Sequence, residues 1–185
     1  MRAIFSRGSL ACLLATVVLL SASAVRAESQ QEVLDRFLIT ELQSRYALAH
    51  DLTDPAMYAS VFTEDAELYG AGRLLAKGRE ALHAIGVNDR KRFNAGAQEG
   101  QRSFGALRHV ITNSVIELDG DAAAKGVCYV LTVVNRPDRG PEILSVGRYE
   151  DEYRKVAGEW LIAKREIVMD MGNSELGKAT GLFGE

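Results

Sequence analysis

The sequence predicts an α+β domain in which three helices come first and a sheet of mostly antiparallel strands follows. Two observations indicate this fold class. Apolar side chains from Val33 to Ala49 recur at three- and four-residue spacing, as on one face of an amphipathic helix. From His109 onward the spacing changes to two, which is typical of strands with one buried face. A sheet curled around the first helix would bury both apolar faces, so we expect a curved sheet that encloses an apolar pocket open at one end.

The first 27 residues have the organisation of a signal peptide. Arg2 and Arg7 form a positive head, residues 10–20 an apolar core, and small residues follow. The apolar run is about half of the length that crosses a bilayer, so we expect it to be removed and not kept as an anchor. We therefore predict export to the periplasm or the exterior, with a domain over residues 28–171 and a flexible, glycine-rich tail over residues 172–185.

Capping and turn-forming residues indicate where the helices begin and end. The first helix is expected over residues 29–51. Asp54 followed by Pro55 is typical of the N-cap and first turn of a second, short helix, which ends near Phe62. A third helix is expected over residues 79–93, after a hairpin that turns at the glycines 70 and 72.

Strands fill most of the remaining chain. The loop at residues 94–105 is long enough to rim a pocket, although an ordinary surface loop is the alternative reading. The expected strands are residues 66–69, 73–77, 109–118, 122–135, 143–156 and 159–171.

Charge and cysteine content narrow the classes of partner. The chain has a formal net charge of −3, and the signal segment holds three arginines and no acidic residue, so the rest is more acidic still. We therefore expect no nucleic acid and no anionic membrane as a partner. Cys128 is the only cysteine after residue 27, which excludes an internal disulfide and predicts a buried thiol. No second thiol or close group of histidines suggests a zinc site, and we expect neither a metal nor an organic cofactor.

A candidate acid–base pair combines the end of the first helix with the start of the first long strand. Asp51 closes the helix, and His109 opens the strand. A histidine is a workable base near pH 7, and a carboxylate on its other ring nitrogen fixes the tautomer and stabilises the imidazolium. The alternative is a solvated His109 and a surface Asp51 that caps the next helix. His50 competes for the pocket, because helical spacing stacks it above Tyr46, whereas Tyr46 and Asp51 lie roughly 140° apart.

Further polar and aromatic residues are candidates for the same pocket. Arg165 alternates with Leu161 and Ile167, which puts its charge on an apolar face. It therefore needs a partner there, either a ligand anion or a carboxylate such as Glu41 or Asp51. Aromatic strand residues are more often core, but four could line a pocket for an apolar ligand: Tyr69, Phe104, Tyr129 and Tyr149.

Several motifs together resemble the SnoaL-like branch of the nuclear-transport-factor-2-like superfamily, in the subgroup of scytalone dehydratase, bile-acid 7α-dehydratase and hexachlorocyclohexane dehydrochlorinase. The resemblance covers about residues 39–168. It is carried by Tyr46 with Asp51, by Phe62-Thr63-Glu64-Asp65-Ala66, by Gly78-Arg79-Glu80-Ala81, by Arg108-His109, by the run from Gly147 to Tyr153, and by the Gly158-Glu159-Trp160 turn followed by Lys164-Arg165.

The resemblance implies a cone-shaped fold and a set of roles. It implies that Asp51 and His109 form an acid–histidine dyad, with Tyr46 and Arg165 as polarising donors, and it puts Tyr69 close to a second dehydratase tyrosine. The sequence departs from the dehydratases on the next strand. There they carry another histidine or aspartate, and this chain offers only Cys128, Tyr129 and Thr132.

The expected function is an exported, cofactor-independent lyase of the dehydratase or elimination type, acting on a small hydrophobic substrate. An isomerase with the same dyad is a close variant. A carrier or accessory protein that keeps the pocket and does no chemistry is the alternative from another class. The resemblance also implies a homo-oligomer, a dimer or trimer formed through the open face of the sheet.

Overall fold

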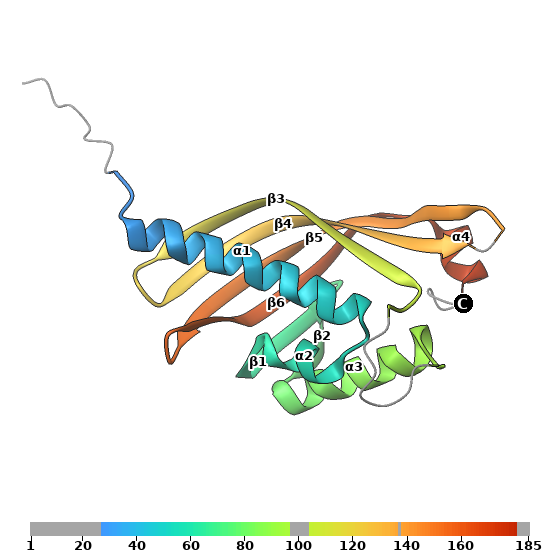
Figure 1. Ribbon diagram of the computed structural model, residues 1–185, viewed down its shortest axis with the longest axis horizontal. Coiled ribbons are helices and arrows are strands. Elements are labelled where there is room, and N and C mark those ends of the chain that lie inside the picture. Colours follow the sequence, from blue (N-terminus) through green and yellow to red (C-terminus); the bar gives the residue numbers. More distant parts are fainter. Residues whose placement is uncertain (1–26, 97–103, 137, 181–185) are drawn as a thin grey trace, which may run out of the picture.

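The computed structural model describes residues 27–96, 104–136 and 138–180. The expected signal peptide lies almost wholly outside these residues, as does the middle of the loop predicted at residues 94–105. Within the described chain, no helix is long and apolar enough to cross a bilayer. The elements are α1 (Gln30–Asp51), α2 (Pro55–Ser60), β1 (Phe62–Gly70), β2 (Arg73–Lys77), α3 (Arg79–Phe93), β3 (Leu107–Asp119), β4 (Ala123–Arg136), β5 (Gly140–Val156), β6 (Glu159–Gly172) and α4 (Ser174–Ala179) (Figure 1).

The strands form one six-stranded sheet in the order β2-β1-β6-β5-β4-β3. All neighbours run antiparallel except β1 and β6, which are parallel. Figure 1 shows α1 along one face of the curved sheet, and α2 with α3 beside β1 and β2. The predicted α+β class is confirmed, with three helices before the long strands.

Helix α1 docks on the sheet through both apolar and polar contacts. Its start is fixed by a capping box between Ser29 and Glu32. Further along, Asp35 is buried and accepts hydrogen bonds from Trp160 Nε1 at 2.9 Å and Lys155 Nζ at 2.6 Å. The apolar face toward the sheet is formed by Ile39, Leu42, Tyr46 and Ala49.

The apolar face of α1 is shorter than the sequence predicts. Val33 and Phe37 are 55% and 63% exposed, so they point away from the sheet. The reason is that Asp35 occupies the inward position of this turn and anchors it to Lys155 and Trp160.

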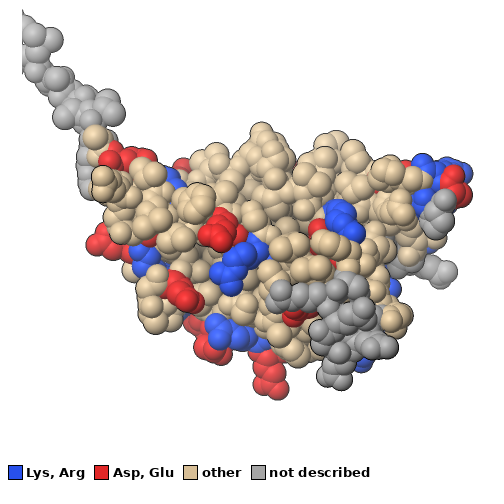
Figure 2. Space-filling model, in the orientation of Figure 1, with Lys and Arg blue, Asp and Glu red and all other residues tan. Residues whose placement is uncertain are grey.

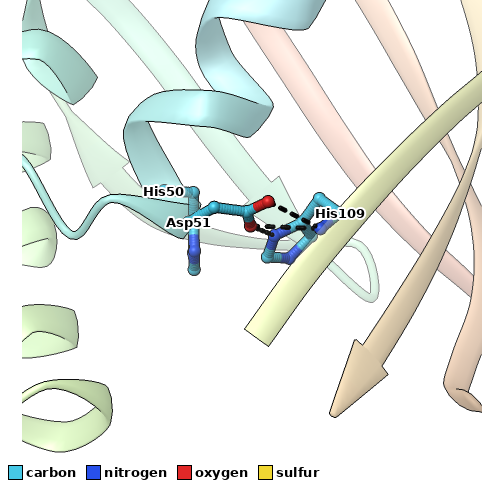
Figure 3. A group of neighbouring side chains, drawn as sticks. All are labelled: His50, Asp51 and His109. Atoms are coloured by element: carbon cyan, nitrogen blue, oxygen red, sulfur yellow. Dashed lines mark hydrogen bonds and ion pairs between the residues drawn. The ribbon is translucent and has the colours of Figure 1, made fainter. Parts of the chain in front are cut away.

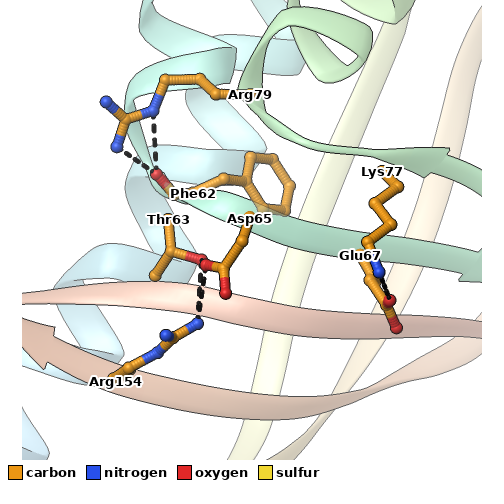
Figure 4. A network of polar contacts seen from close by, with 7 residues as sticks. All are labelled: Phe62, Thr63, Asp65, Glu67, Lys77, Arg79 and Arg154. Carbon is orange, nitrogen blue, oxygen red and sulfur yellow. Dashed lines mark hydrogen bonds and ion pairs between the residues drawn. The ribbon is translucent and has the colours of Figure 1, made fainter.

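Polar contacts fix β1 and the start of α3 (Figure 4). Arg79 donates from Nε to the carbonyl oxygen of Phe62 at 3.1 Å, and Gly78 supplies the left-handed φ of 84° that turns the chain from β2 into α3. Arg154 of β5 reaches across to Asp65 at 2.8 Å. The Gly-Arg motif therefore has a structural role in this chain, because it ties α3 to the sheet.

The described part of the predicted tail contains a helix. Residues 174–179 form α4, with Asn173 as its side-chain cap. Leu176 is buried against Leu107, Val134 and Leu144, so this helix covers the ends of β3, β4 and β5. The sequence analysis did not predict this helix, because Leu176 is its one large apolar residue and a single residue shows no helical spacing.

Acidic and basic residues are interspersed on the face of the molecule shown in Figure 2, and tan surface separates them. This face offers no gathered positive charge among its described residues. That distribution agrees with the expectation that nucleic acid is not a partner, which stays a prediction.

Candidate active site

The end of α1 and the start of β3 are joined at Asp51. The backbone N–H of Gly105 donates to the Asp51 carbonyl oxygen at 2.8 Å, just before β3 begins. Because β3 is an edge strand, the N–H groups on its outer side need no partner strand and can bond the helix instead. The loop and the helix end therefore place one carboxylate against one strand.

Asp51 and His109 lie in direct contact (Figure 3). The Asp51 carboxylate accepts the backbone N–H of His109 at 3.0 Å on Oδ1 and 3.1 Å on Oδ2. The ring nitrogen Nδ1 lies 2.7 Å from Oδ1. An ionised carboxylate only accepts, so Nδ1 carries the proton and Nε2 keeps its lone pair. Each side chain is 8% exposed, which contradicts the solvated alternative.

The surroundings of His109 favour its neutral form. Burial lowers the pKa of His109 below its ordinary value, the hydrogen bond that its Nδ1–H donates to Asp51 opposes this shift, and the nearby His50 adds to it. A neutral imidazole with a free Nε2 lone pair can accept a proton near pH 7.

His50 also lies at the site. The sequence analysis treated His50 and His109 as alternatives, but the structure places both there. The ring centroid of His50 is 4.4 Å from that of His109, with the planes at 62°. Its Nε2 faces Asp89 Oδ2 of α3 at 3.2 Å. Asp89 is a residue that the sequence analysis missed. Helical spacing could have identified Asp89, because it lies on the same face of α3 as the buried Leu82 and Gly86.

Tyr46 belongs to an aromatic cluster inside the cone. It is 1% exposed and its ring contacts those of Tyr58, Phe62 and Tyr149 at centroid distances between 5.3 and 5.8 Å. Burial raises the pKa of Tyr46, and the charge of Arg165 opposes this shift. The ring also lies 6.3 Å from that of His50, as the four-residue spacing predicts.

Arg165 is fully buried and its main partner is Asp151. Nε and Nη2 bond the two carboxylate oxygens at 2.7 and 2.6 Å. The guanidinium stacks between Tyr46 and Tyr149 at about 4 Å from each ring centroid. Burial lowers the pKa of Arg165, but Asp151 overcomes this and leaves it well above the ordinary value. Nη1 has no partner within the described residues.

The expected partners of Arg165, Glu41 and Asp51, were wrong. Asp151 is the cross-strand neighbour of Arg165 on β5. The sequence could have indicated a buried Asp151, because it alternates with Tyr149 and Tyr153 on the inward face of the strand. The Asp151 carboxylate also accepts from the Tyr153 hydroxyl at 2.5 Å.

The four aromatic residues predicted to line a pocket are dispersed. Tyr149 is buried in the aromatic cluster. Tyr129 is 48% exposed, because its neighbours Cys128 and Val130 take the inward positions of β4. Phe104 is 54% exposed beneath Arg108, and the Tyr69 hydroxyl bonds Glu67 at 2.9 Å. The expected lining therefore needs correction, since only Tyr149 faces the interior cluster.

Two hollows differ in size and position. A recess of about 10 Å³ is lined by Ala49, His50, Thr53, Asp54, Tyr58, Gly86 and Asp89. That volume is about one water molecule. A larger hollow of about 360 Å³ is lined by residues such as Val115, Val127 and Lys164. These alternate with the inward Ile116, Cys128 and Arg165, so this hollow lies on the opposite face of the sheet.

His50, Asp51 and His109 are the described residues whose donor atoms could approach a cation, since one atom from each lies within 4.8 Å of the others. However, both Asp51 oxygens already accept bonds from His109. This arrangement is that of an acid–base cluster. Burial raises the pKa of the Cys128 thiol to about 11, so little of the nucleophilic thiolate forms near pH 7.

Comparisons with known proteins agree with this fold. Residues 31–166 match the SnoaL-like domain family. A protein of unknown function from Mycobacterium tuberculosis superposes with a TM-score of 0.65 at 26% identity, over 78% of this chain and 77% of that one. Among curated proteins, no sequence matches this chain.

Two other solved structures share the fold alone, because their identity is lower. A protein assigned as a scytalone dehydratase, from Novosphingobium aromaticivorans, gives a TM-score of 0.63 at 24% identity, over 77% of this chain and 89% of that one. A hexachlorocyclohexane dehydrochlorinase from Novosphingobium barchaimii gives a TM-score of 0.62 at 21% identity, over 77% of this chain and 91% of that one.

Proposed function

This chain belongs to the SnoaL-like domain family, and we propose that it is a lyase that eliminates water or another leaving group from a small hydrophobic molecule. The observation that carries the proposal is the buried Asp51–His109 contact of 2.7 Å, held by two further bonds from the His109 backbone. Two structural neighbours are named for eliminations, a dehydration and a dehydrochlorination. Export from the cytoplasm is part of the proposal and is supported by the N-terminal sequence.

The reaction needs a base for an acidic C–H bond. His109 Nε2 takes that proton, the C–H electron pair forms the double bond, and the leaving group departs with its own pair. Asp51 stabilises the imidazolium that results. A positioned base of this kind contributes about 10²- to 10⁴-fold to the rate. The pair's own groups carry this step, so the proposed reaction uses no metal or organic cofactor.

Tyr46 and Arg165 support the site electrostatically. Arg165 is already neutralised by Asp151, and Tyr46 covers the guanidinium. We therefore assign Tyr46 and Arg165 to balancing the buried charge in the interior near the Asp51–His109 pair. Nη1 of Arg165 is the guanidinium nitrogen that has no partner among the described residues, and it could donate to a leaving group.

The test is turnover of hydroxy-ketones and halogenated rings by the wild type and by His109→Ala. Formation of the double bond is followed by absorbance, and halide release by an electrode. The matched control is His83→Ala, because His83 is exposed on α3. We expect the wild type and His83→Ala to turn over equally and His109→Ala to lose at least about 100-fold. Equal activity of His109→Ala would exclude it as the base.

An isomerase would use the same base but return the proton to another carbon. Product mass separates the two reactions, because an isomer keeps the substrate mass and a lyase product has lost the leaving group.

A binding protein without chemistry is the second candidate, and the small recess favours it. The recess of about 10 Å³ beside His50 admits no substrate without movement of the lining side chains. A binder predicts saturable binding of an apolar ligand that is equal in wild type and His109→Ala, with no turnover in either.

A further inference from the structure

A second acid–histidine pair lies beside the first. His50 is the residue before Asp51 on α1, and its Nε2 faces Asp89 Oδ2 of α3 at 3.2 Å. The close packing of α3 on α2 brings Asp89 into reach. Gly86 makes this packing feasible, since a Cβ there would lie 2.9 Å from the Cα of Pro55.

One nitrogen of His50 is left without a partner. Nε2 faces a carboxylate and therefore carries a proton. Nδ1 is buried and has no hydrogen-bond partner within the described residues. The His50 side chain belongs to the lining of the small recess, together with Asp89 and Tyr58. Since buried polar groups are nearly always paired, Nδ1 is the atom at which a polar ligand atom or a water fits.

The two imidazoles are close enough to influence each other's charge. Their centroids lie 4.4 Å apart, and one nitrogen of each, with one Asp51 oxygen, falls within 4.8 Å. Two cations at this separation in a buried site repel each other, so protonation of one ring opposes protonation of the other. His109 favours the neutral form, as its surroundings show. His50 has the Asp89 carboxylate at 3.2 Å as its own counter-charge.

We propose that His50, held by Asp89, is the second proton-transfer residue of this site and delivers a proton from Nδ1 to the oxygen that leaves the substrate. The inference rests on the proposed lyase activity. On the strand next to β3, where the resemblance implies another histidine or aspartate, this chain offers Cys128, Tyr129 and Thr132.

The step balances with two histidines. His109 Nε2 accepts the proton of the C–H bond, whose electron pair forms the C=C bond. The C–O bond breaks with its pair on oxygen, and that oxygen takes the proton from His50 Nδ1 and leaves as water. One proton has then moved from His50 to His109. Its return between the adjacent rings restores the starting state.

The groups facing His50 come from every neighbouring element. Asp89 faces it from α3, His109 from β3 at 4.4 Å, and Tyr58 from α2 at a centroid distance of 5.8 Å. Tyr46 of the same helix lies at 6.3 Å, and Asp54 lines the same recess.

A nuclear magnetic resonance titration of the histidine rings tests the coupling without any substrate. In His50→Gln, loss of the neighbouring cation should raise the pH at which His109 titrates. His83→Ala is the control and should leave that titration unchanged, since His83 is exposed. Circular dichroism melting checks that each variant is folded. An unchanged His109 titration in folded His50→Gln would overturn the proton coupling.

Turnover separates a chemical role of His50 from a purely structural one. The wild type should show a bell-shaped pH profile of kcat, and His50→Gln should lose its basic limb and at least about 10-fold in kcat with little change in KM. Asp89→Asn should behave similarly, and Asp89→Glu should recover part of the rate. A basic limb retained in His50→Gln would refute the acid role while leaving the lyase proposal intact. Absence of wild-type turnover would refute both roles, whatever the titration shows.

Discussion

At the scale of single residues, the site depends on what each buried polar atom contacts. Asp51 uses both carboxylate oxygens on His109, and Asp151 uses both on Arg165. These two carboxylates have different tasks, because one orients a titratable ring and the other neutralises a permanent cation. The sequence predicted the first pair. It could not supply the second, because Asp151 and Arg165 are neighbours only through the β5–β6 register.

Asp51→Asn tests the orienting carboxylate. The amide oxygen can still accept from the His109 backbone, but the variant no longer stabilises the imidazolium or enforces the Nδ1–H tautomer. We expect kcat/KM to fall by about 10²- to 10⁴-fold with the melting temperature little changed. Asp121→Asn, in an exposed turn, is the control. Full activity in Asp51→Asn would argue against the dyad.

Arg165→Met tests the buried ion pair. The substitution leaves the Asp151 carboxylate buried without its cation, which we expect to cost about 3–5 kcal/mol in the free energy of unfolding. Adding Asp151→Leu removes that charge and should recover part of the loss. Urea denaturation measures both variants. If the double variant were as unstable as the single one, the ion pair would not be the source of the destabilisation.

At the scale of elements, helical spacing and the capping and turn residues predicted the boundaries of α1, α2 and α3 within a few residues. Two features escaped that reasoning. The early turns of α1 have apolar spacing, yet Val33 and Phe37 are exposed because Asp35 takes the inward position. The packing of α3 on α2 depends on the tertiary approach at Gly86, which one helix alone does not reveal.

Gly86→Ala tests that approach. A Cβ 2.9 Å from Pro55 Cα would push α3 away from α2 and so draw Asp89 from His50. We expect a loss of about 1–3 kcal/mol in stability, measured by urea denaturation, and a lower kcat. Gly96→Ala is the control, since a Cβ there meets none of the described atoms within 4 Å. Equal stability of the two variants would contradict close packing at Gly86.

At the scale of the whole molecule, the predicted α+β class with its curved, mostly antiparallel sheet is confirmed. Its interior is less open than expected. Aromatic rings of Tyr46, Tyr58 and Tyr149 fill it around Arg165. Periodicity identifies which side chains point inward but not how much space they leave, which explains why the expected pocket lining was only partly placed.

The far face of the sheet relates to oligomeric state, which stays a prediction. Val115, Val127 and Tyr129 are each more than 40% exposed there. We expect a dimer or trimer by light scattering coupled to size exclusion, and Tyr129→Glu should shift it toward monomer because the charge would be buried in the interface. A monomeric wild type at high concentration would remove this expectation.

The central claim is that His109 is the base, and the pH dependence of kcat/KM tests it most directly. Burial lowers the pKa of His109 below its ordinary 6.5, so the neutral, active form persists to more acidic pH than for an exposed histidine. We predict an acid limb below pH 6.5 in the wild type that disappears, with the activity, in His109→Gln. An acid limb at the same pH in an active His109→Gln would contradict the account.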